Sequence, residues 1–279
     1  MLRPMLASPT DAPLDDPRLV YEPKYDGIRA IAEVGKAVSV PNAQTRPLVR
    51  LWSRLGNEKT HQFPEIARAL EKWASRLAHP VVLDGEIVAL DEHGEPTRFQ
   101  QLQGRIHLSE EKGGSTAFVA FDLLREGPRD LRDRPLLERR AVLERLFART
   151  GSPRLRISDM VRGDGRALYK AALDRGWEGL IAKRADSKYR SGKRTPDWHK
   201  LKIVREQEFV IAGWTEPRQS RAYFGALLLG VYEKGPKATP GRLVYVGHTG
   251  TGFNERELAR LMQLPHSGRS RLCEPPLTR

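Results

Sequence analysis

The sequence predicts an α+β fold, with a large domain of mixed sheets and helices followed by a smaller β-rich domain. Three observations support this. The chain has 279 residues, enough for two domains. Strand-like and helix-like segments alternate irregularly in the first two-thirds, unlike a β-α repeat. After Lys202 the chain becomes a series of short strands separated by turns. We therefore expect one domain over residues 1–203 and a second over residues 204–279.

Four short apolar runs in the first domain have the length and composition of β-strands. They are Arg29–Val34, Val81–Leu90, Phe118–Leu124 and Gly179–Lys183.

Three segments between these runs have the periodicity of amphipathic helices. They are Phe63–Leu77, Pro135–Arg149 and Arg166–Asp174, and Gly176 is placed to cap the third.

The second domain shows three further strand-like runs and one short helix, separated by turns that contain glycine or proline. The strands are Glu208–Trp214, Gly225–Tyr232 and Leu243–Gly247, and the helix is Asn254–Leu264.

Composition limits the protein class. Lys and Arg number 48 against 35 Asp and Glu, and the resulting net charge of +13 favours a polyanionic partner such as nucleic acid. The single cysteine, Cys273, excludes an internal disulfide and a cysteine-rich zinc site. Residues 1–17 lack the apolar core of a signal peptide, and no run is long enough to span a membrane. We expect a cytoplasmic protein without membrane contact.

The segment Tyr21–Ala30 carries the strongest local signal. Its Asp26-Gly27 pair is typical of a tight turn between two strands, which would place Lys24 at a strand end. A lysine acts as a nucleophile only when it is neutral, so burial or nearby cations must lower its pKa. Candidate cations are Arg29, Lys183, Lys200 and Lys202. Alone, this pattern favours an ordinary hairpin with a surface lysine.

Further motifs follow in a fixed order and change this interpretation. Lys24, Asp26, Gly27 and Arg29 fit the pattern K-x-D-G-x-R. The later elements are Ser53–Gly56 with Phe63–Glu65, Leu83–Val88, Phe118–Leu124, Glu178–Lys183 and Trp198–Lys202. Together they resemble the motifs of the covalent nucleotidyltransferases, which include ATP-dependent DNA ligases, RNA ligases and mRNA-capping enzymes. Within that superfamily the chain is most similar to the ligase domain of bacterial end-joining DNA ligases.

The resemblance implies an ATP-dependent DNA ligase that seals nicks between a 5′-phosphate and a 3′-hydroxyl. Lys24 would attack the α-phosphorus of ATP and carry AMP as a covalent lysyl-AMP. The AMP would then pass to the DNA as a DNA-adenylate. The implied cofactors are ATP and Mg²⁺ or Mn²⁺. The implied partners are nicked double-stranded DNA and DNA end-joining proteins. The implied setting is DNA repair and recombination in the bacterial cytoplasm, with the protein acting as a monomer.

The resemblance also implies roles for individual side chains. Glu22 would lie near the adenine edge, and Phe121 would stack on the base, although Phe121 also fits a plain core position. Arg29 and Glu86 would contact the ribose. Glu178, together with Glu86, would hold the metal ion.

Three lysines would form a clamp for the α-phosphate. Lys183 belongs to one motif, and Lys200 and Lys202 are two residues apart, so the period of a strand puts both on one face. Between Arg184 and Arg205 there are eight Lys or Arg residues against two Asp, which we interpret as part of the DNA footprint.

Two features depart from the resembled family. Leu55 stands where the family motif has asparagine. No R-x-D-K motif follows Lys202, and the three strands predicted there fall short of a five-stranded OB-fold barrel. We therefore expect an incomplete OB-fold and weakened attack on ATP. Two alternatives stay open: an RNA ligase or capping-type nucleotidyltransferase, and a nucleic-acid-binding remnant that no longer activates ATP.

Overall fold

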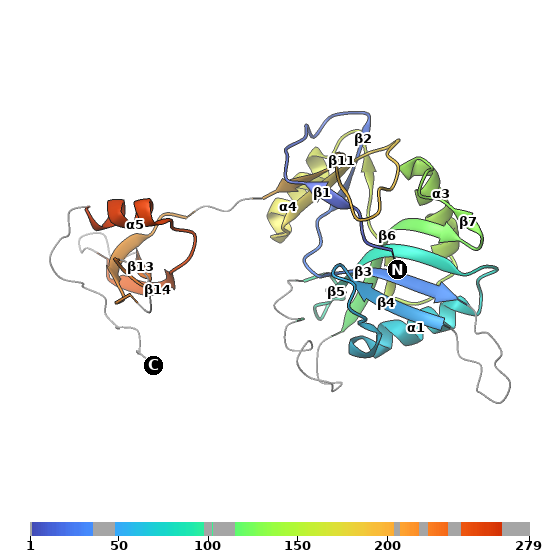
Figure 1. The fold of residues 1–279 in the computed structure, drawn as a ribbon, viewed down its shortest axis with the longest axis horizontal. Helices are drawn as coiled ribbons and strands as arrows, with labels where there is room; N and C mark the ends of the chain where they lie inside the picture. Colours follow the sequence, from blue (N-terminus) through green and yellow to red (C-terminus); the bar gives the residue numbers. More distant parts are fainter. Residues whose placement is uncertain are drawn as a thin grey trace. The chain divides into compact units, whose positions relative to one another are not determined.

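The structure of the protein is a computed structural model. It describes residues 2–35, 48–97, 102, 115–203, 207–217, 223–233 and 241–263. The chain divides into two compact units, Met1–Val204 and Arg205–Arg279 (Figure 1).

A six-stranded sheet forms the centre of the larger unit. Its order is β4-β3-β5-β6-β7, and β8 pairs with β6 in parallel. The strands are β3 (Ile28–Gly35), β4 (Leu48–Ser53), β5 (Val81–Ala89), β6 (Thr116–Glu126), β7 (Arg129–Asp130) and β8 (Leu155–Ile157).

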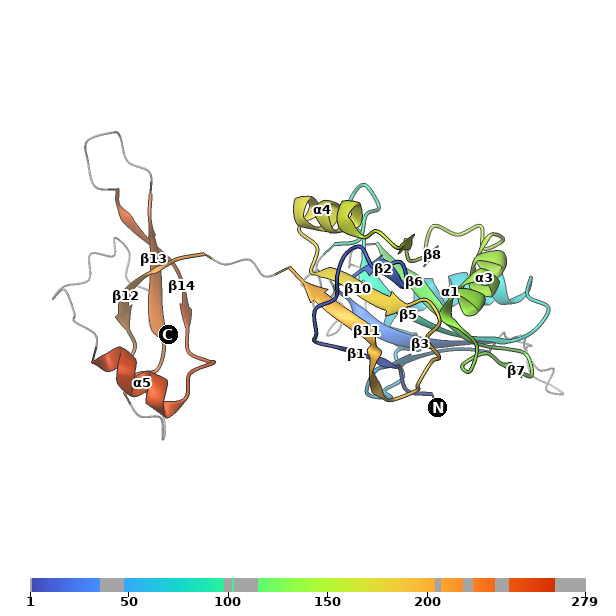
Figure 2. The same ribbon diagram turned by 90° about the horizontal axis from the view of Figure 1, so that it is seen from above.

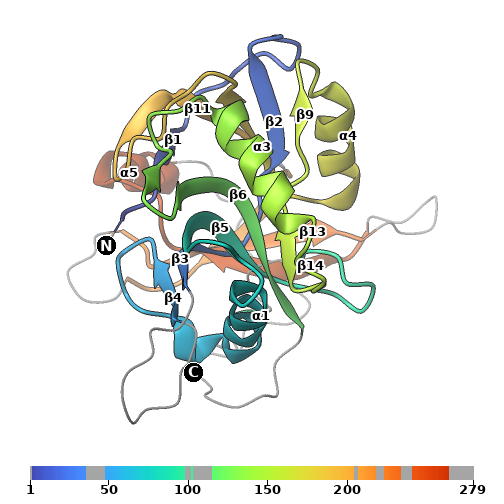
Figure 3. The same ribbon diagram turned by 90° about the vertical axis from the view of Figure 1, so that its right-hand side faces the viewer.

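Two helices cover one face of this sheet. Helix α1 (Pro64–Ala74) contacts β3, β4 and β6, and helix α3 (Leu136–Phe147) contacts β6 and β8 (Figure 3). Their apolar faces meet at Trp73 and Phe147, whose ring centroids are 4.9 Å apart. Because side chains alternate along a strand, Ala30 and Ala32 of β3 point into this core. The neighbouring Arg29 and Ile31 therefore point to the opposite face.

A five-stranded sheet packs against that opposite face. Ile31 shares a buried cluster with Met5 and Ala7 at the N-terminus and with Tyr189 and Trp198. The sheet has the order β1-β11-β10-β2-β9. Figure 2 shows β1, β11, β10 and β2 of this sheet. The strands are β1 (Leu6–Ser8), β2 (Leu19–Pro23), β9 (Val161–Arg162), β10 (Gly179–Arg184) and β11 (Arg194–Lys202).

Helix α4 (Arg166–Arg175) covers the outer face of the five-stranded sheet, against β2 and β10. It ends at Gly176, whose φ of 70° is left-handed and therefore suits glycine. The predicted cap is confirmed.

The smaller unit contains a three-stranded antiparallel sheet and a helix among its described residues. The elements are β12 (Val210–Trp214), β13 (Leu227–Tyr232), β14 (Leu243–Thr249) and α5 (Glu255–Met262). A capping box between Asn254 and Glu257 starts α5, and Leu258 of that helix packs on Phe224 and Leu227. The three strands and the helix predicted for this region are confirmed.

The predicted α+β class is confirmed, and so are the strands and helices expected in the larger unit. The hairpin alternative for Lys24 is wrong. Strand β2 pairs with β10 and β9, whereas β3 pairs with β4 and β5, so the two strands belong to different sheets. The turn at Asp26-Gly27 therefore carries the chain from one sheet to the other. Within the described residues, no helix is long and apolar enough to cross a membrane.

One buried ion pair generates a stability prediction. Arg139 of α3 and Asp122 of β6 are both 0% exposed and are joined at 2.7 Å. Arg139→Ala should lower the free energy of unfolding by about 3–5 kcal/mol, because it leaves a buried carboxylate without its counter-charge. Urea denaturation would measure the loss.

Arg145→Ala, on the same helix, is the matched control. Its side chain is 65% exposed and lies 3.4 Å from Glu126, so its removal should cost well under about 1 kcal/mol. Similar losses in the two variants would contradict the prediction.

Candidate functional site

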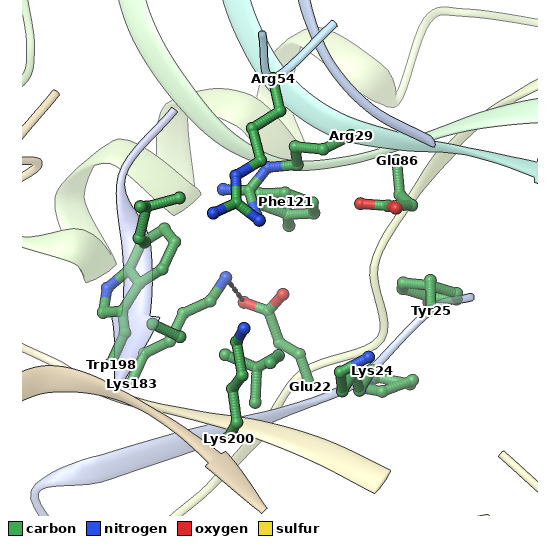
Figure 4. A pocket seen from close by; sticks show the side chains of 14 residues that line it. Glu22, Lys24, Tyr25, Arg29, Arg54, Glu86, Phe121, Lys183, Trp198 and Lys200 are labelled. Atoms are coloured by element: carbon green, nitrogen blue, oxygen red, sulfur yellow. Dashed lines mark hydrogen bonds and ion pairs between the residues drawn. The ribbon is translucent and has the colours of Figure 1, made fainter. Parts of the chain in front are cut away.

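A cleft lies between the two sheets of the larger unit, and both sheets contribute side chains to it (Figure 4). It contains about 820 Å³ of empty space, part of which is open to solvent. The five-stranded sheet and its continuations supply Leu6, Ala7, Glu22, Pro23, Lys24, Tyr25, Ile181, Lys183, Trp198 and Lys200. The six-stranded sheet and the residue after β4 supply Arg29, Arg54, Glu86 and Phe121.

The two-residue period of the strands explains why these side chains converge. Lys183 and Ile181 share a face of β10, and Lys200 and Trp198 share a face of β11. In register, Lys183 lies opposite Trp198. Leu180 and Ala182 of β10 and Leu201 of β11 alternate with these residues. They point to the other face of the sheet, into the core beneath α4.

Lys24 follows the last residue of β2 and is held at both its main chain and its side chain. Its N–H donates to the carbonyl of Gly179 at 2.9 Å, and its ammonium group forms an ion pair with Glu178. The side chain is 18% exposed. Burial lowers the pKa of Lys24. The neighbouring cations Lys200 and Lys202 lower this pKa further, whereas the carboxylates Glu86 and Asp26 raise it. The site therefore makes the neutral, nucleophilic amine easier to reach than it is for a lysine in water.

The turn after Lys24 requires a glycine for steric reasons. A Cβ at Gly27 would collide with the carbonyl oxygen of Ile87 and would touch the Glu86 side chain. Gly27 thus allows the connection between the sheets to pass close to β5, which brings Lys24 and Glu86 into the same cleft.

Lys183 is the most deeply buried cation of the cleft. Its Nζ donates to Glu22 at 2.8 Å, and the two side chains are 2% and 3% exposed. The same Nζ lies 4.6 Å from the ring centre of Phe121 and 4.5 Å from that of Trp198. Burial lowers the pKa of Lys183, and Glu22 opposes this shift.

Arg29 is fixed on the opposite sheet. Its Nε and Nη2 donate to the fully buried carboxylate of Asp84 at 2.6 and 2.7 Å. The guanidinium group lies 4.4 Å from the ring centre of Phe121. Phe121 is itself 7% exposed and lines the cleft, so it meets two cations as well as the apolar interior.

Glu86 pairs with Arg29 in the register of β3 and β5. Burial raises the pKa of Glu86 to about 7, although the nearby Arg29 lowers it. Lys200 also has a lowered pKa, because of burial and then because of Arg194 and Arg54. Lys202, two residues further along β11, is exposed.

Seven of the residues predicted for the site line this one cleft: Glu22, Lys24, Arg29, Glu86, Phe121, Lys183 and Lys200. Glu178 reaches it through Lys24, and Lys202 does not line it but is near enough to lower the pKa of Lys24. The structure adds Tyr25, Arg54, Trp198 and the N-terminal Leu6 and Ala7. Of these, Tyr25, Arg54 and Trp198 stand within the sequence motifs, and Trp198 could have been assigned to the cleft because it stands two residues before Lys200 on the same strand face.

A divalent cation would find carboxylates here but no enclosed cage. In the part of the chain that the structure describes, no group of three or more His, Cys, Asp or Glu side chains is arranged to hold a metal. Glu86 and Glu178 near Lys24 fit an ion such as Mg²⁺, which binds through one or two carboxylates with substrate phosphates and water as its other ligands.

Comparison with known families agrees with this geometry. The family described as "ATP dependent DNA ligase domain" matches residues 4–202, and the "ATP dependent DNA ligase C terminal region" matches residues 220–277. The chain belongs to the ATP-dependent DNA ligases.

Individual relatives narrow the likeness. The chain is 39% identical over 264 residues to the multifunctional non-homologous end joining protein LigD of Pseudomonas aeruginosa, covering 94% of this chain and 29% of that protein. It is 32% identical over 271 residues to DNA ligase C of Mycobacterium tuberculosis, covering 93% of this chain and 68% of that protein. This chain thus spans under a third of the length of the LigD relative.

Solved structures show the same relationship. The crystal structure of the ligase domain from M. tuberculosis LigD matches with a TM-score of 0.61 and 36% identity, over 98% of this chain and 82% of that one. A mycobacterial DNA ligase D complexed with ATP and MES matches with a TM-score of 0.62 and 35% identity, over 98% and 81%.

The raised pKa of Glu86 generates a prediction about pH and stability. A carboxyl group whose folded-state pKa is raised from 4.5 to about 7 binds more protons in the folded than in the unfolded chain over that interval. Its contribution to stability is therefore favourable at low pH and is lost as the pH rises from about 4.5 to 7. Glu86→Gln keeps the neutral form at every pH.

The variant should therefore gain stability relative to the wild type as the pH rises through that range. Urea unfolding of both proteins in EDTA, at pH 5 and pH 8, would measure the difference. A wild-type stability that does not fall relative to the variant would contradict the raised pKa.

Proposed function

We propose that this ligase chain seals nicks in double-stranded DNA through a covalent lysyl-AMP formed at Lys24. The observation that carries the proposal is the position of Lys24, partly withdrawn from water at the crossing between two sheets, with Lys183, Lys200 and Arg29 around the same cleft. The family match supplies the reaction class. A half-buried lysine with a lowered pKa, set among cations, supplies the nucleophile and the electrostatic stabilisation that attack on a phosphate requires.

The chemistry proceeds in three transfers. The neutral Nζ of Lys24 attacks the α-phosphorus of ATP, a nitrogen–phosphorus bond forms and pyrophosphate leaves. The 5′-phosphate of the nick then attacks the same phosphorus, releasing the lysine and giving a DNA-adenylate. Finally the 3′-hydroxyl attacks the 5′-phosphate and AMP leaves. The ammonium proton of Lys24 passes to water before the first step, because its partner Glu178 is 44% exposed and water reaches the pair.

We assign the other cleft residues by their chemistry. Phe121 offers an aromatic ring on which adenine would stack, with Glu22 nearby at the adenine edge. Arg29 and Glu86 face each other across β3 and β5 and would contact the ribose. The lysines Lys183, Lys200 and Lys202 would neutralise the α-phosphate. Mg²⁺ or Mn²⁺ held by Glu178 and Glu86 would neutralise phosphate charge when bound.

We further propose nicked duplex DNA as the substrate, bound in part by the basic segment from Arg184 to Arg205. In the described part of this segment, residues 184–203, the lysines and arginines lie at the end of β10, on β11 and between the two strands, and β11 brings Lys200 into the cleft. The named relatives include multifunctional end joining proteins, so we place the chain in DNA repair by end joining, in the bacterial cytoplasm, as a monomer with end-joining proteins as partners. The two units correspond in this proposal to an adenylation domain, 1–203, and an OB-type domain, 204–279.

Lys24→Ala should abolish the acid-labile attachment of AMP, because it removes the amine that bonds to the α-phosphorus in the proposed reaction. Binding to a nicked duplex should change little, since one lysine is a small part of a polyelectrolyte contact. The measurement is incubation with α-labelled ATP and Mg²⁺, denaturing electrophoresis, and a gel-shift assay on nicked DNA. Lys170→Ala, an exposed lysine on α4, is the control and should label normally. Labelled AMP mapped by mass spectrometry to another lysine would refute the assignment.

Glu178→Gln should lower the rate of lysyl-AMP formation by roughly 10²–10³-fold while the protein stays folded, because a charged group at the reacting centre is replaced by a neutral one of the same shape. Single-turnover labelling with and without EDTA would measure the rate. Glu138→Gln, an exposed carboxylate on α3, should leave the rate unchanged. The role of Glu178 in lysyl-AMP formation would be contradicted by normal labelling of the Glu178 variant. It would also be contradicted by wild-type labelling that is the same with and without EDTA.

A further inference from the structure

Tyr189 lies in the segment between β10 and β11 and is 3% exposed. It belongs to none of the motifs that carry the chemistry. Its hydroxyl donates to Oδ2 of Asp84 at 2.5 Å and accepts the main-chain N–H of Met5 at 2.9 Å. The direction of these bonds follows from the partners, because a carboxylate can only accept and an N–H can only donate. Its phenolic pKa is raised well above the ordinary value by burial and by Asp84, which keeps this proton in place.

The two partners of the hydroxyl are themselves joined through Arg29. Asp84 is 0% exposed and takes the bidentate pair from Arg29, and Nη2 of Arg29 donates to the carbonyl of Met5 at 3.3 Å. The hydrogen bonds among Tyr189, Asp84, Arg29 and Met5 therefore form a closed circuit, hereafter the Tyr189 network. Both main-chain polar groups of Met5 are used in it.

The Tyr189 network reaches the cleft at two points. One is the Arg29 guanidinium, which lies over Phe121 and lines the cleft. The other is the N-terminal strand, because Leu6 and Ala7 directly follow Met5 and form part of the cleft wall. Leu6 is bound in turn at the start of β11: it pairs with Arg194, and its N–H donates to the carbonyl of the preceding Lys193 at 2.8 Å. The hydroxyl of Tyr189 itself does not line the cleft.

Loss of that hydroxyl would remove one hydrogen bond from each of two buried groups. The buried N–H of Met5 would have no acceptor, and the Asp84 carboxylate would lose one of the donors that stabilise its charge. Arg29 donates to the Asp84 carboxylate and to the carbonyl of Met5, so both disturbances reach it. The aromatic ring of Tyr189 has a separate packing role, edge-on against Trp198 with centroids 5.9 Å apart. Replacement by phenylalanine keeps this packing and removes only the hydroxyl.

We propose that Tyr189 is a positioning residue for nucleotide binding, which acts through Asp84 and Met5 to fix Arg29 and the Leu6–Ala7 wall without touching the nucleotide. This inference rests on the proposed function, since it takes the cleft to be the ATP site.

Tyr189→Phe should weaken binding of α,β-methylene-ATP, an analogue that cannot release pyrophosphate, by about tenfold in isothermal titration. The rate of lysyl-AMP formation at saturating ATP should fall by less than about threefold, because the reacting groups are untouched. The matched control is Tyr21→Phe. Tyr21 is 0% exposed and its hydroxyl donates to the carbonyl of Pro13 at 2.6 Å, away from the cleft, so its loss should leave analogue binding within about twofold.

A double-mutant cycle separates positioning from general loss of structure. Arg29→Lys cannot make the bidentate bond to Asp84, so adding Tyr189→Phe to it should weaken analogue binding by less than about threefold more. The proposal is overturned by unchanged binding in Tyr189→Phe, by equal effects in both backgrounds, or by unfolding of Tyr189→Phe when Tyr21→Phe folds. A wild-type chain that forms no lysyl-AMP would instead defeat the proposed function.

Discussion

Desolvation of positive charge governs the arrangement of the larger unit. A cation that leaves water loses several kcal/mol of solvation, so each must face a carboxylate or stay close to solvent. Two sheets meet here with cations on the facing sides of both. Lys183 is paired with Glu22 on one sheet, and Arg29 with Asp84 on the other. Without these carboxylates the sheets could not approach closely enough to enclose a cleft lined by positive groups.

The buried pairs also determine where the aromatic ring of the cleft lies. Asp122 follows Phe121 on β6 and holds Arg139, which in turn donates to the carbonyl of Ser187 beyond β10. Phe121 is thus fixed from behind by an ion pair whose members are both 0% exposed. In front, Arg29 and Lys183 lie over its ring at 4.4 and 4.6 Å. An aromatic platform held this way keeps its orientation with little freedom left to lose when a base stacks on it.

Much of the fold was predictable because its signals are local. The helical periods of α1 and α3, the apolar runs of β3, β5 and β6, and the glycine cap at Gly176 all depend on neighbours within a few residues. The pairing of β2 with β10 joins Glu22 to Ile181, far apart in sequence, and no local pattern specifies it. Strand β11 was harder still, because its alternating polar residues contain no apolar run. The role of Tyr189 could not be predicted from local sequence either, because both partners of its hydroxyl lie more than a hundred residues away.

The pairing of Lys24 differs from that of the other cleft cations, and the difference has a chemical meaning. The partners of Lys183 and Arg29 are 3% and 0% exposed, so separating either pair would strand a charge in a dry interior. The partner of Lys24, Glu178, is 44% exposed, and water can take over its solvation when the lysine leaves. Lys24 can therefore give up its proton and its partner at modest cost while the surrounding cations stay in place. A nucleophile needs this freedom, whereas the groups that position a substrate must lack it.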